Sequence, residues 1–307
     1  MARVFDLAMT HKLDTDDFFI HQIQQHSAVL GLNFFLIEPV WLDCFFQRLA
    51  EGAIWAKVLL NMHSEHHLPE ENYHRLVRLA HHKGVRVIDP PEVALAACDK
   101  ARLHPRLVEN GFNVPATIIV PREDVPAFRL TQEQKEMLGL PFVIKPSLGY
   151  GRKGVILDAQ DEEDLKRSFG AWDNPFYLLQ PRIVAGTIGN CPAYFRVYYA
   201  FGSIWSCWWN CFTDQYRIVT EKDIEQFGLA ALPEIVQRLA TLTGMTFFST
   251  ELSQVENGAF VLIDYVNDQC HMLSQSASPS MGVPDQVVAA IAKRLVEGAR
   301  QLALQPR

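Results

Sequence analysis

The segment 141–159, PFVIKPSLGYGRKGVILDA, contains the residue types of a phosphate-binding loop. A predicted strand, 142–146, carries Lys145 and leads into a loop, from which a second strand, 155–159, returns. The loop contains three glycines and one lysine: Gly149, Gly151, Lys153 and Gly154. Glycines let the backbone approach a ligand closely, and exposed backbone amides can bind phosphate oxygens. The segment lacks G-K-[ST] and a strand follows it, so it is not a Walker A loop, and by itself it is equally compatible with a flexible hairpin tip.

The segment 247–268, FFSTELSQVENGAFVLIDYVND, places two acids where they could share a metal ion. Asn257-Gly258 predicts a two-residue hairpin turn, and counting outward from that turn sets Glu251 opposite Asp264. Side chains paired in this way lie on one face of a sheet, roughly 5 Å apart at Cβ. Two adjacent carboxylates repel each other, and a bound Mg²⁺, which prefers oxygen ligands, would remove that repulsion. The alternative is a pair of acids on a solvated sheet face.

Bulk composition limits the classes of function. The 307 residues suffice for two or three packed units, and 49% hydrophobic with 21% charged residues is typical of a soluble globular protein. The formal net charge of -7 argues against sequence-independent binding of nucleic acids, which requires a basic surface. The 6 cysteines form no C-x-x-C pair and are predicted to be reduced thiols, and the N-terminus lacks the apolar core of a signal peptide. We therefore expect a cytoplasmic protein.

Strand and helix patterns divide the chain into two regions. In the first, strands alternate with amphipathic helices, which predicts a parallel sheet with helices on both faces. The expected strands there are 2–9, 33–38, 56–62 and 85–90, with expected helices at 16–31 and 69–84. The pattern changes near residue 99, and from residue 117 hairpins with inserted helices, at 131–140 and 161–172, predict antiparallel sheets. A long helix is expected at 284–304. The expected fold class is therefore α/β followed by α+β.

The most apolar stretch, 193–212, raises the question of a membrane span. It contains Arg196, several aromatic residues and a Gly202-Ser203 turn near its middle. Two strands joined by a tight turn explain these residues better than a transmembrane helix does.

Five motifs in a fixed order resemble the ATP-grasp superfamily, and the resemblance covers most of the chain. After the α/β region come Asp99-Lys100 with VENGFNVPAT, then FVIKP with the glycine loop, then YLLQPRI, then an acidic hairpin ending in VND. Each motif is weak alone, and the order makes the set specific. The resemblance implies a pre-ATP-grasp-like domain at 1–98 and an ATP-grasp domain at 99–307, with 116–184 as its small lid subdomain. ATP would lie between two antiparallel sheets.

The resemblance implies roles for the residues that match the nucleotide-binding motifs. Lys100 and Lys145 match lysines that reach the phosphates, and the loop from Gly149 to Gly154, with Gly151 and Lys153, matches the loop that closes over them. The backbone of the segment 180–183 would bind adenine, where a proline is tolerable because it keeps its carbonyl. The expected residues of this hinge are Gln180, Pro181 and Ile183.

The metal and ribose sites depart from the family pattern. The resemblance makes Glu251 and Asp264 the metal-binding acids and Asn267 the residue that completes the set. The spacing Asp264-x-x-Asn267 puts Asn267 on the opposite face of an ideal strand, so either a bulge corrects it or Asp268 takes that role. The usual acid for the ribose hydroxyls is missing, and Thr187 stands near its place.

The resemblance implies a carboxylate–amine or related ligase that uses ATP and Mg²⁺. A small-molecule carboxylate would attack the γ-phosphate to give an acyl phosphate, and a nucleophilic co-substrate would displace phosphate. Lys145 and Arg196 would, with Mg²⁺, offset the developing charge. The alternatives are a small-molecule kinase on the same fold and a non-catalytic ATP-binding protein. We expect neither a nucleic-acid nor a membrane partner, and the sequence leaves a homodimer open.

Overall fold

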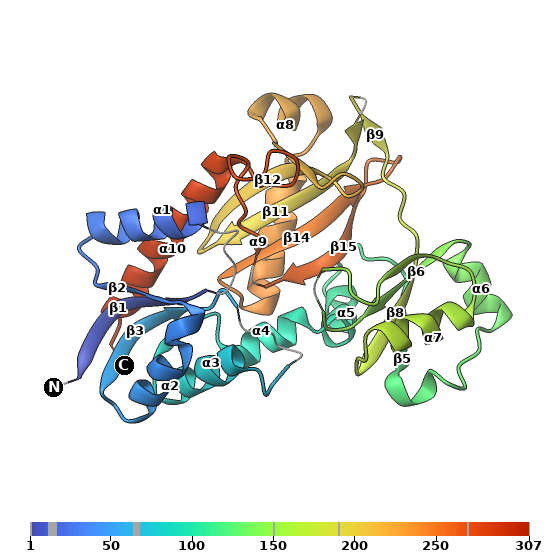
Figure 1. Ribbon diagram of the computed structural model, residues 1–307. Coiled ribbons are helices and arrows are strands. Elements are labelled where there is room, and N and C mark those ends of the chain that lie inside the picture. The colour runs from blue at the N-terminus through green and yellow to red at the C-terminus, as the bar shows by residue number, and fades with distance from the viewer. Residues whose placement is uncertain are drawn as a thin grey trace. The chain divides into compact units, whose positions relative to one another are not determined.

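The computed structural model describes residues 2–11, 17–63, 68–149, 151–189, 191–268 and 270–306 (Figure 1). The chain packs into two compact units, each made of segments that are not contiguous in the sequence. The first unit contains Met1–Ala94, Phe195–Thr250 and Asn267–Arg307, and the second contains Leu95–Tyr194 and Glu251–Val266. Because this division follows packing rather than chain order, the domain boundaries expected at residues 98, 116 and 184 stay predictions.

The first unit contains the predicted parallel sheet, with strand order β2-β1-β3-β4. Its strands are β1 (Arg3–Thr10), β2 (Phe34–Ile37), β3 (Ile54–Leu60) and β4 (Arg86–Ile88). Its helices are α1 (Asp17–Val29), the short 3₁₀ turn η2 (Pro39–Trp41), α2 (Leu42–Ala50) and α3 (Asn72–His82). Met9 and Val58 pack with α1 on one face of the sheet, whereas Ala8 and Leu59 pack with α2 and α3 on the other (Figure 1). Alternate residues of a strand point to opposite faces, so the predicted two-sided covering is confirmed.

A second sheet has the strand order β13-β12-β11-β14-β15, and β12 pairs antiparallel with both β11 and β13. Its strands are β11 (Tyr194–Ala200), β12 (Ser203–Asn210), β13 (Gln215–Ile218), β14 (Phe247–Gln254) and β15 (Phe260–Asn267). Phe201 and Gly202 join β11 to β12 with φ angles of 46° and 86°, as a two-residue hairpin turn requires. The apolar stretch 193–212 is therefore a hairpin, as predicted. Among the described residues, no helix is both long and apolar enough to cross a membrane.

Helix α10 (Asp285–Leu304) is buried between strands of both sheets within the first unit. Its Ile291 and Leu295 share one apolar core with Met9 of β1 and Tyr198 of β11. Gly298 of this helix faces the ring of Phe201, and a Cβ atom added to it would lie 2.4 Å from the ring. Two further helices belong to this unit: α8 (Glu221–Phe227) and α9 (Ala231–Thr243).

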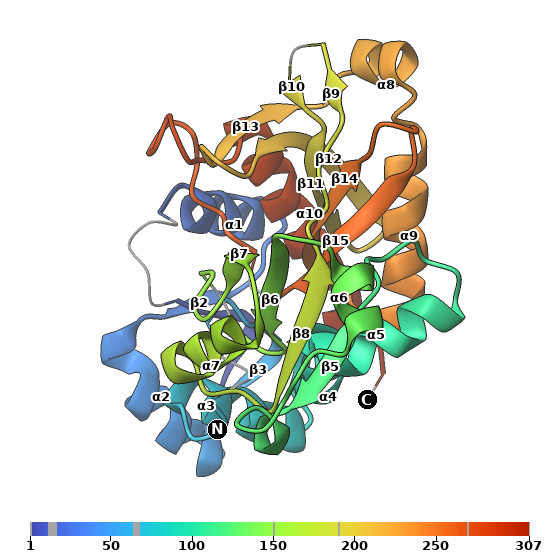
Figure 2. The same ribbon diagram turned by 90° about the vertical axis from the view of Figure 1, so that its right-hand side faces the viewer.

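The second unit is built around a four-stranded antiparallel sheet with strand order β5-β8-β6-β7 (Figure 2). Its strands are β5 (Ile118–Pro121), β6 (Phe142–Pro146), β7 (Ile156–Ala159) and β8 (Phe176–Pro181), with the short pair β9 (Thr187–Ile188) and β10 (Cys191–Pro192). Its helical segments are η3 (Arg122–Asp124), α5 (Lys100–Glu109), α6 (Gln132–Leu138) and α7 (Glu162–Ala171), and α4 (Pro91–Cys98) precedes them. Leu138 of α6 and Leu165 of α7 pack with Ile144 and Tyr177 of the sheet. The predicted antiparallel region with inserted helices is confirmed.

Helix α5 was not predicted, because Pro105 lies inside it and removes one backbone hydrogen bond. The Asp99 side chain caps the helix by accepting hydrogen bonds from the amides of Ala101 and Arg102. Leu103 and Leu107 are buried on one side of the helix. Capping and burial of this face therefore outweigh the cost of the proline.

Two glycine-to-alanine variants test the packing of α10. Gly298→Ala should lower the free energy of unfolding by about 1–3 kcal/mol, because its Cβ would overlap the Phe201 ring. Gly170→Ala in α7 has open space around the added Cβ and should raise the free energy of unfolding by about 0.5 kcal/mol. Urea denaturation of both variants measures the difference. A stabilised Gly298→Ala variant would contradict the packing described for α10.

Candidate functional site

The glycine loop begins at a hydrogen-bonded base in the second unit. Ser147 Oγ and Leu148 N each donate to Asn174 Oδ1 at 2.9 Å, and Asn174 Nδ2 donates to Leu148 O at 2.6 Å. The backbone amide of Lys100, at the start of α5, donates to Ser147 O at 3.0 Å. The start of the loop is therefore fixed relative to Lys100. Tyr150, within the loop, lies outside the described residues.

Two glycines of the loop pack so closely against Trp172 that a side chain at either position would crowd it. A Cβ atom added to Gly149 would lie 3.1 Å from Trp172 Nε1, and one added to Gly154 would lie 2.6 Å from Trp172 Cβ. Gly151 has φ +59° and open space around it, and the neighbouring Lys153 places its ammonium group 4.8 Å from the centre of the Trp172 ring. The ends of the loop are thus held against Trp172, and its tip is exposed.

Two lysines and two acids of the predicted site lie close together in the second unit. Lys145 Nζ donates to Ile263 O at 2.7 Å, and Lys100 Nζ lies 3.5 Å from Asp264 Oδ1. Burial lowers the pKa of Lys145, the carboxylates of Asp264 and Glu251 raise it, and the ammonium of Lys100 lowers it. The lysines predicted from β6 and from Asp99-Lys100 are therefore brought to the acids of the hairpin.

The hairpin between β14 and β15 has a longer turn than predicted. Val255 N donates to Ala259 O at 2.9 Å and Gly258 N donates to Val255 O at 2.8 Å, so the loop has three residues and not two. Gly258 adopts φ +83°, because Asn-Gly also fits a turn followed by one left-handed glycine. The two-residue prediction is wrong, and a regular ladder counted from this turn pairs Glu251 with the residue before Asp264. The two acids are instead related through Lys145, whose pKa both of them raise.

The oxygen atoms of the predicted metal ligands suit a magnesium ion. No group of three or more His, Cys, Asp or Glu side chains that could hold a metal occurs among the described residues. Magnesium in nucleotide sites, however, usually takes one or two carboxylates from the protein, and its other ligands include phosphate oxygens of the nucleotide. Glu251 and Asp264 are the carboxylates that the sequence predicts for this role. At the end of β15, the amide nitrogen of Asn267 is buried and has no hydrogen-bond partner within the described ranges. The oxygen of an amide is, like a carboxylate oxygen, of the ligand type that Mg²⁺ prefers.

The predicted adenine hinge lies at the end of β8. Gln180 is buried, Pro181 is the last residue of the strand, and the segment 182–186 that follows has no regular structure. Ile183 O accepts a hydrogen bond from Tyr194 Oη at 3.3 Å. Thr187 is exposed at the start of β9. That these residues bind adenine stays a prediction.

Arg196 lies on β11 in the first unit, where Ser249 and Trp209 are among its contacts. Its Nε and Nη2 atoms donate to Ser249 Oγ at 3.2 and 3.1 Å, and its guanidinium carbon lies 5.8 Å from the centre of the Trp209 ring. Burial, together with the charge of Arg196, lowers the pKa of His271. Burial raises the pKa of the Cys270 thiol to about 12, so this thiol is protonated near neutral pH and is a poor nucleophile.

Comparison with solved structures identifies the fold. The RimK domain protein ATP-grasp from Sphaerobacter thermophilus DSM 20745 is 17% identical, with a TM-score of 0.66 over 95% of this chain and 98% of that chain. The D-alanine–D-alanine ligase from Bacillus anthracis is 11% identical, with a TM-score of 0.62 over 98% of this chain and 99% of that chain. The ATP-grasp ligase PsnB, solved with a minimal precursor, Mg and ADP, is 12% identical, with a TM-score of 0.58 over 98% and 99%. The chain has the ATP-grasp fold. No family model and no curated protein matches the sequence.

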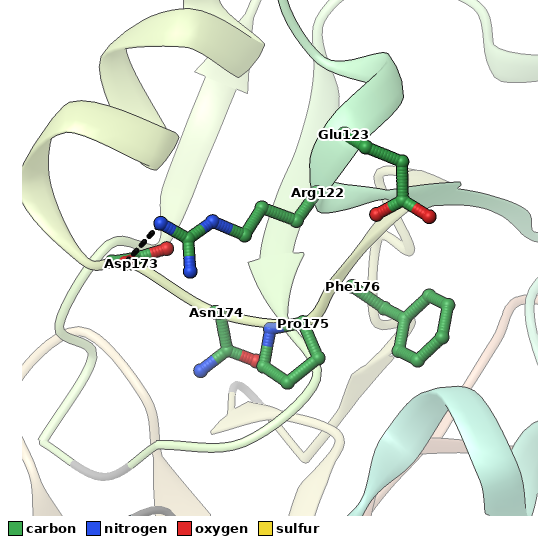
Figure 3. Close-up of a pocket in the computed structure, with 6 residues that line it drawn as sticks. All are labelled: Arg122, Glu123, Asp173, Asn174, Pro175 and Phe176. Atoms are coloured by element: carbon green, nitrogen blue, oxygen red, sulfur yellow. Dashed lines mark ion pairs between the residues drawn. The ribbon is translucent and has the colours of Figure 1, made fainter.

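A shallow pocket in the second unit shares Asn174 with the base of the glycine loop. Its lining residues are Arg122, Glu123, Asp173, Asn174, Pro175 and Phe176 (Figure 3). The guanidinium of Arg122 points to Asp173, with an ion pair of 2.9 Å, and both side chains are exposed. No predicted ATP-contacting residue lines this pocket. An exposed pair of this kind contributes little to binding or stability.

Several residues that contact the predicted site residues were missed in the sequence. Trp172 and Asn174 hold the glycine loop, and they follow α7 in a segment with no motif of its own. His104, Thr117 and Tyr265 hydrogen-bond with one another or with Gln180. The spacing of four residues between Lys100 and His104 is the one signal in the sequence that places a missed residue, His104, on the same helix face as a predicted one.

The charge balance around Lys145 leads to a prediction about Asp264. Asp264→Asn removes a carboxylate that offsets Lys100 and Lys145, so without metal and nucleotide we expect the free energy of unfolding to fall by about 1–3 kcal/mol. Glu163→Gln is the control, because it removes the exposed partner of Lys166 and should change stability by less than about 0.5 kcal/mol. Urea denaturation compares the two. Unchanged or raised stability in Asp264→Asn would mean that repulsion from Glu251 outweighs the attraction of the lysines.

Proposed function

We propose that this chain is an ATP- and magnesium-dependent ligase that activates a small-molecule carboxylate as an acyl phosphate for attack by an amine or similar nucleophile. The observation that carries this proposal is the cluster in the second unit, where Lys100, Lys145, Glu251 and Asp264 meet. Ammonium groups suit the phosphates of ATP, and carboxylates suit Mg²⁺. Support also comes from the similar solved structures, which include a D-alanine–D-alanine ligase and the ligase PsnB with Mg and ADP.

The proposed reaction has two steps in which bonds and charges balance. A carboxylate oxygen of the substrate forms a bond to the γ-phosphorus of ATP, and the bond from that phosphorus to the bridging oxygen breaks, so ADP leaves with the electron pair. The amine nitrogen then forms a bond to the acyl carbon, the bond from that carbon to the phosphate oxygen breaks, and the amine loses a proton. No side-chain nucleophile is required, which agrees with the protonated state of the buried thiols Cys207 and Cys270.

The chain's own residues would position the nucleotide and offset its charge. Lys100 and Lys145 would bind phosphate oxygens, and the loop with Gly149, Gly151, Lys153 and Gly154 would cover them and exclude water. The hinge residues Gln180, Pro181 and Ile183 would bind adenine, with Thr187 near the ribose. Arg196 would offset charge on the acyl phosphate.

The proposed metal ligands are three residues on β14 and β15. Glu251, Asp264 and Asn267 would hold Mg²⁺, which when bound would neutralise charge on the phosphates. The alternative third ligand is Asp268. Burial is the main cause of the raised pKa of Asp89, and the charge of Asp268 raises it further. Asp268 therefore lies near another acid.

Product analysis tests this function. The purified chain is incubated with Mg-ATP and a panel of small carboxylic acids, with and without a panel of amines. The proposal predicts that ADP and free phosphate are released together only when an acid and a nucleophile are both present. ADP formed with a phosphorylated product and no free phosphate would instead identify a kinase. Tight Mg-ATP binding without any ADP formation would identify a non-catalytic binding protein.

The exposed tip of the glycine loop gives a second prediction. Gly151, Arg152 and Lys153 are exposed, so trypsin should cut after Arg152 or Lys153 in the free protein. Mg-ATP should slow this cleavage several-fold, because a loop that binds phosphates becomes ordered over them. Mg²⁺ without nucleotide serves as the control and should give no protection. Equal cleavage with and without Mg-ATP, at a concentration that saturates binding, would contradict a phosphate-covering role.

A further inference from the structure

Four polar side chains form one buried hydrogen-bond network in the second unit. Gln180 Nε2 lies 2.9 Å from Thr117 Oγ1 and 3.0 Å from Tyr265 Oη. Tyr265 Oη lies 2.7 Å from His104 Nδ1. Gln180, Tyr265 and His104 are only 2%, 1% and 7% exposed, so water does not compete for these hydrogen bonds.

The hydrogen-bond directions of this network follow from Thr117. Its Oγ1 atom donates to Pro115 O at 2.8 Å, so it accepts from Gln180. The amide nitrogen of Gln180 is a donor only, and its two hydrogens go to Thr117 and Tyr265. The hydroxyl of Tyr265 can therefore donate to His104 Nδ1, which also lies 3.5 Å from Thr117 Oγ1. Burial lowers the pKa of His104 and so favours its neutral form, in which Nδ1 accepts and Nε2 carries the hydrogen.

The network connects three segments that the proposed function assigns to the nucleotide. His104 lies four residues after Lys100 on α5, so both side chains project from one face of that helix. Tyr265 directly follows Asp264 on β15, and Gln180 directly precedes Pro181 at the end of β8. The helix carrying a phosphate-binding lysine, the strand carrying a metal ligand and the adenine hinge are thereby tied to one another by side chains that do not themselves carry charge.

We infer that His104 is a positioning residue for nucleotide binding, which acts as the neutral acceptor for Tyr265 and so fixes Gln180 and the hinge relative to α5 and β15. This inference rests on the proposed function, because Lys100, Asp264 and the hinge would meet a nucleotide only if the chain binds ATP. Holding these segments in their binding geometry before ATP arrives lowers the entropy lost on binding. The network is a preorganising device and touches no reacting atom.

Calorimetry of Mg-ATP binding to three variants tests the inference. His104→Leu removes the acceptor, and Tyr265→Phe removes one oxygen atom, so each should raise the dissociation constant for Mg-ATP about tenfold, as loss of an orienting partner typically does. His104→Asn should restore most of the affinity lost in His104→Leu, because its amide oxygen can accept from Tyr265 near the position of Nδ1. If His104→Leu does not fold, Tyr265→Phe decides the test, since it changes the packing least.

A control separates positioning from general stability. Tyr73→Phe in α3 of the first unit also removes a buried hydroxyl, which donates to His11 O at 3.0 Å. It should lower the melting temperature, as Tyr265→Phe does, and leave the Mg-ATP dissociation constant unchanged. The double variant His104→Leu/Tyr265→Phe should bind Mg-ATP about as weakly as either single variant, because both remove the same interaction.

Two results would overturn the inference. In one, His104→Leu and Tyr265→Phe lower the melting temperature but bind Mg-ATP as tightly as the unaltered protein. In the other, the double variant loses about 100-fold in affinity, as two independent tenfold losses would give. If the unaltered protein itself bound no Mg-ATP, the proposed function would fail first, so the two failures are distinguishable.

Discussion

Charge compensation around Lys145 is the constraint on which the arrangement of the second unit depends. The ammonium group of Lys145 donates to Ile263 O and lies among the charges of Lys100, Asp264 and Glu251. Two partly buried ammonium groups would be costly without carboxylates, and two carboxylates would be costly without cations. Helix α5, strand β6 and the hairpin of β14 and β15 each supply part of this set. In the proposed reaction the groups would exchange partners, with phosphates taking the lysines and Mg²⁺ taking the acids.

The neutral side chains around this cluster position the segments that carry the charged ones. Asn174 and Trp172 hold the ends of the glycine loop, while its tip remains exposed. The network from His104 to Gln180 links α5, β8 and β15 through buried hydrogen bonds. The charged groups would bind the nucleotide, and hydrogen bonds between uncharged side chains would position those charged groups.

The sequence by itself determined the fold class and the identity of the chemical groups. Alternating strand and helix predicted the parallel sheet, and the motif order predicted the ATP-grasp fold that the solved structures share. These predictions succeed because period and motif order are local or linear properties of a chain. Helix α5 escaped prediction, because Pro105 opposes a helix locally, and the Asp99 cap together with the burial of Leu103 and Leu107 outweighs it.

Only the tertiary structure decided which partners those groups have. The Asn257-Gly258 pair is compatible with turns of two or three residues, and the longer turn moved Glu251 out of register with Asp264. Lys100 lies 164 positions from Asp264 in the chain, and His104 lies 161 from Tyr265, so no local pattern could bring these pairs together. The sequence contains the residue types needed for phosphate and metal chemistry. Their charge balance and orientation arise from contacts between distant segments, and these contacts exist only once the chain has folded.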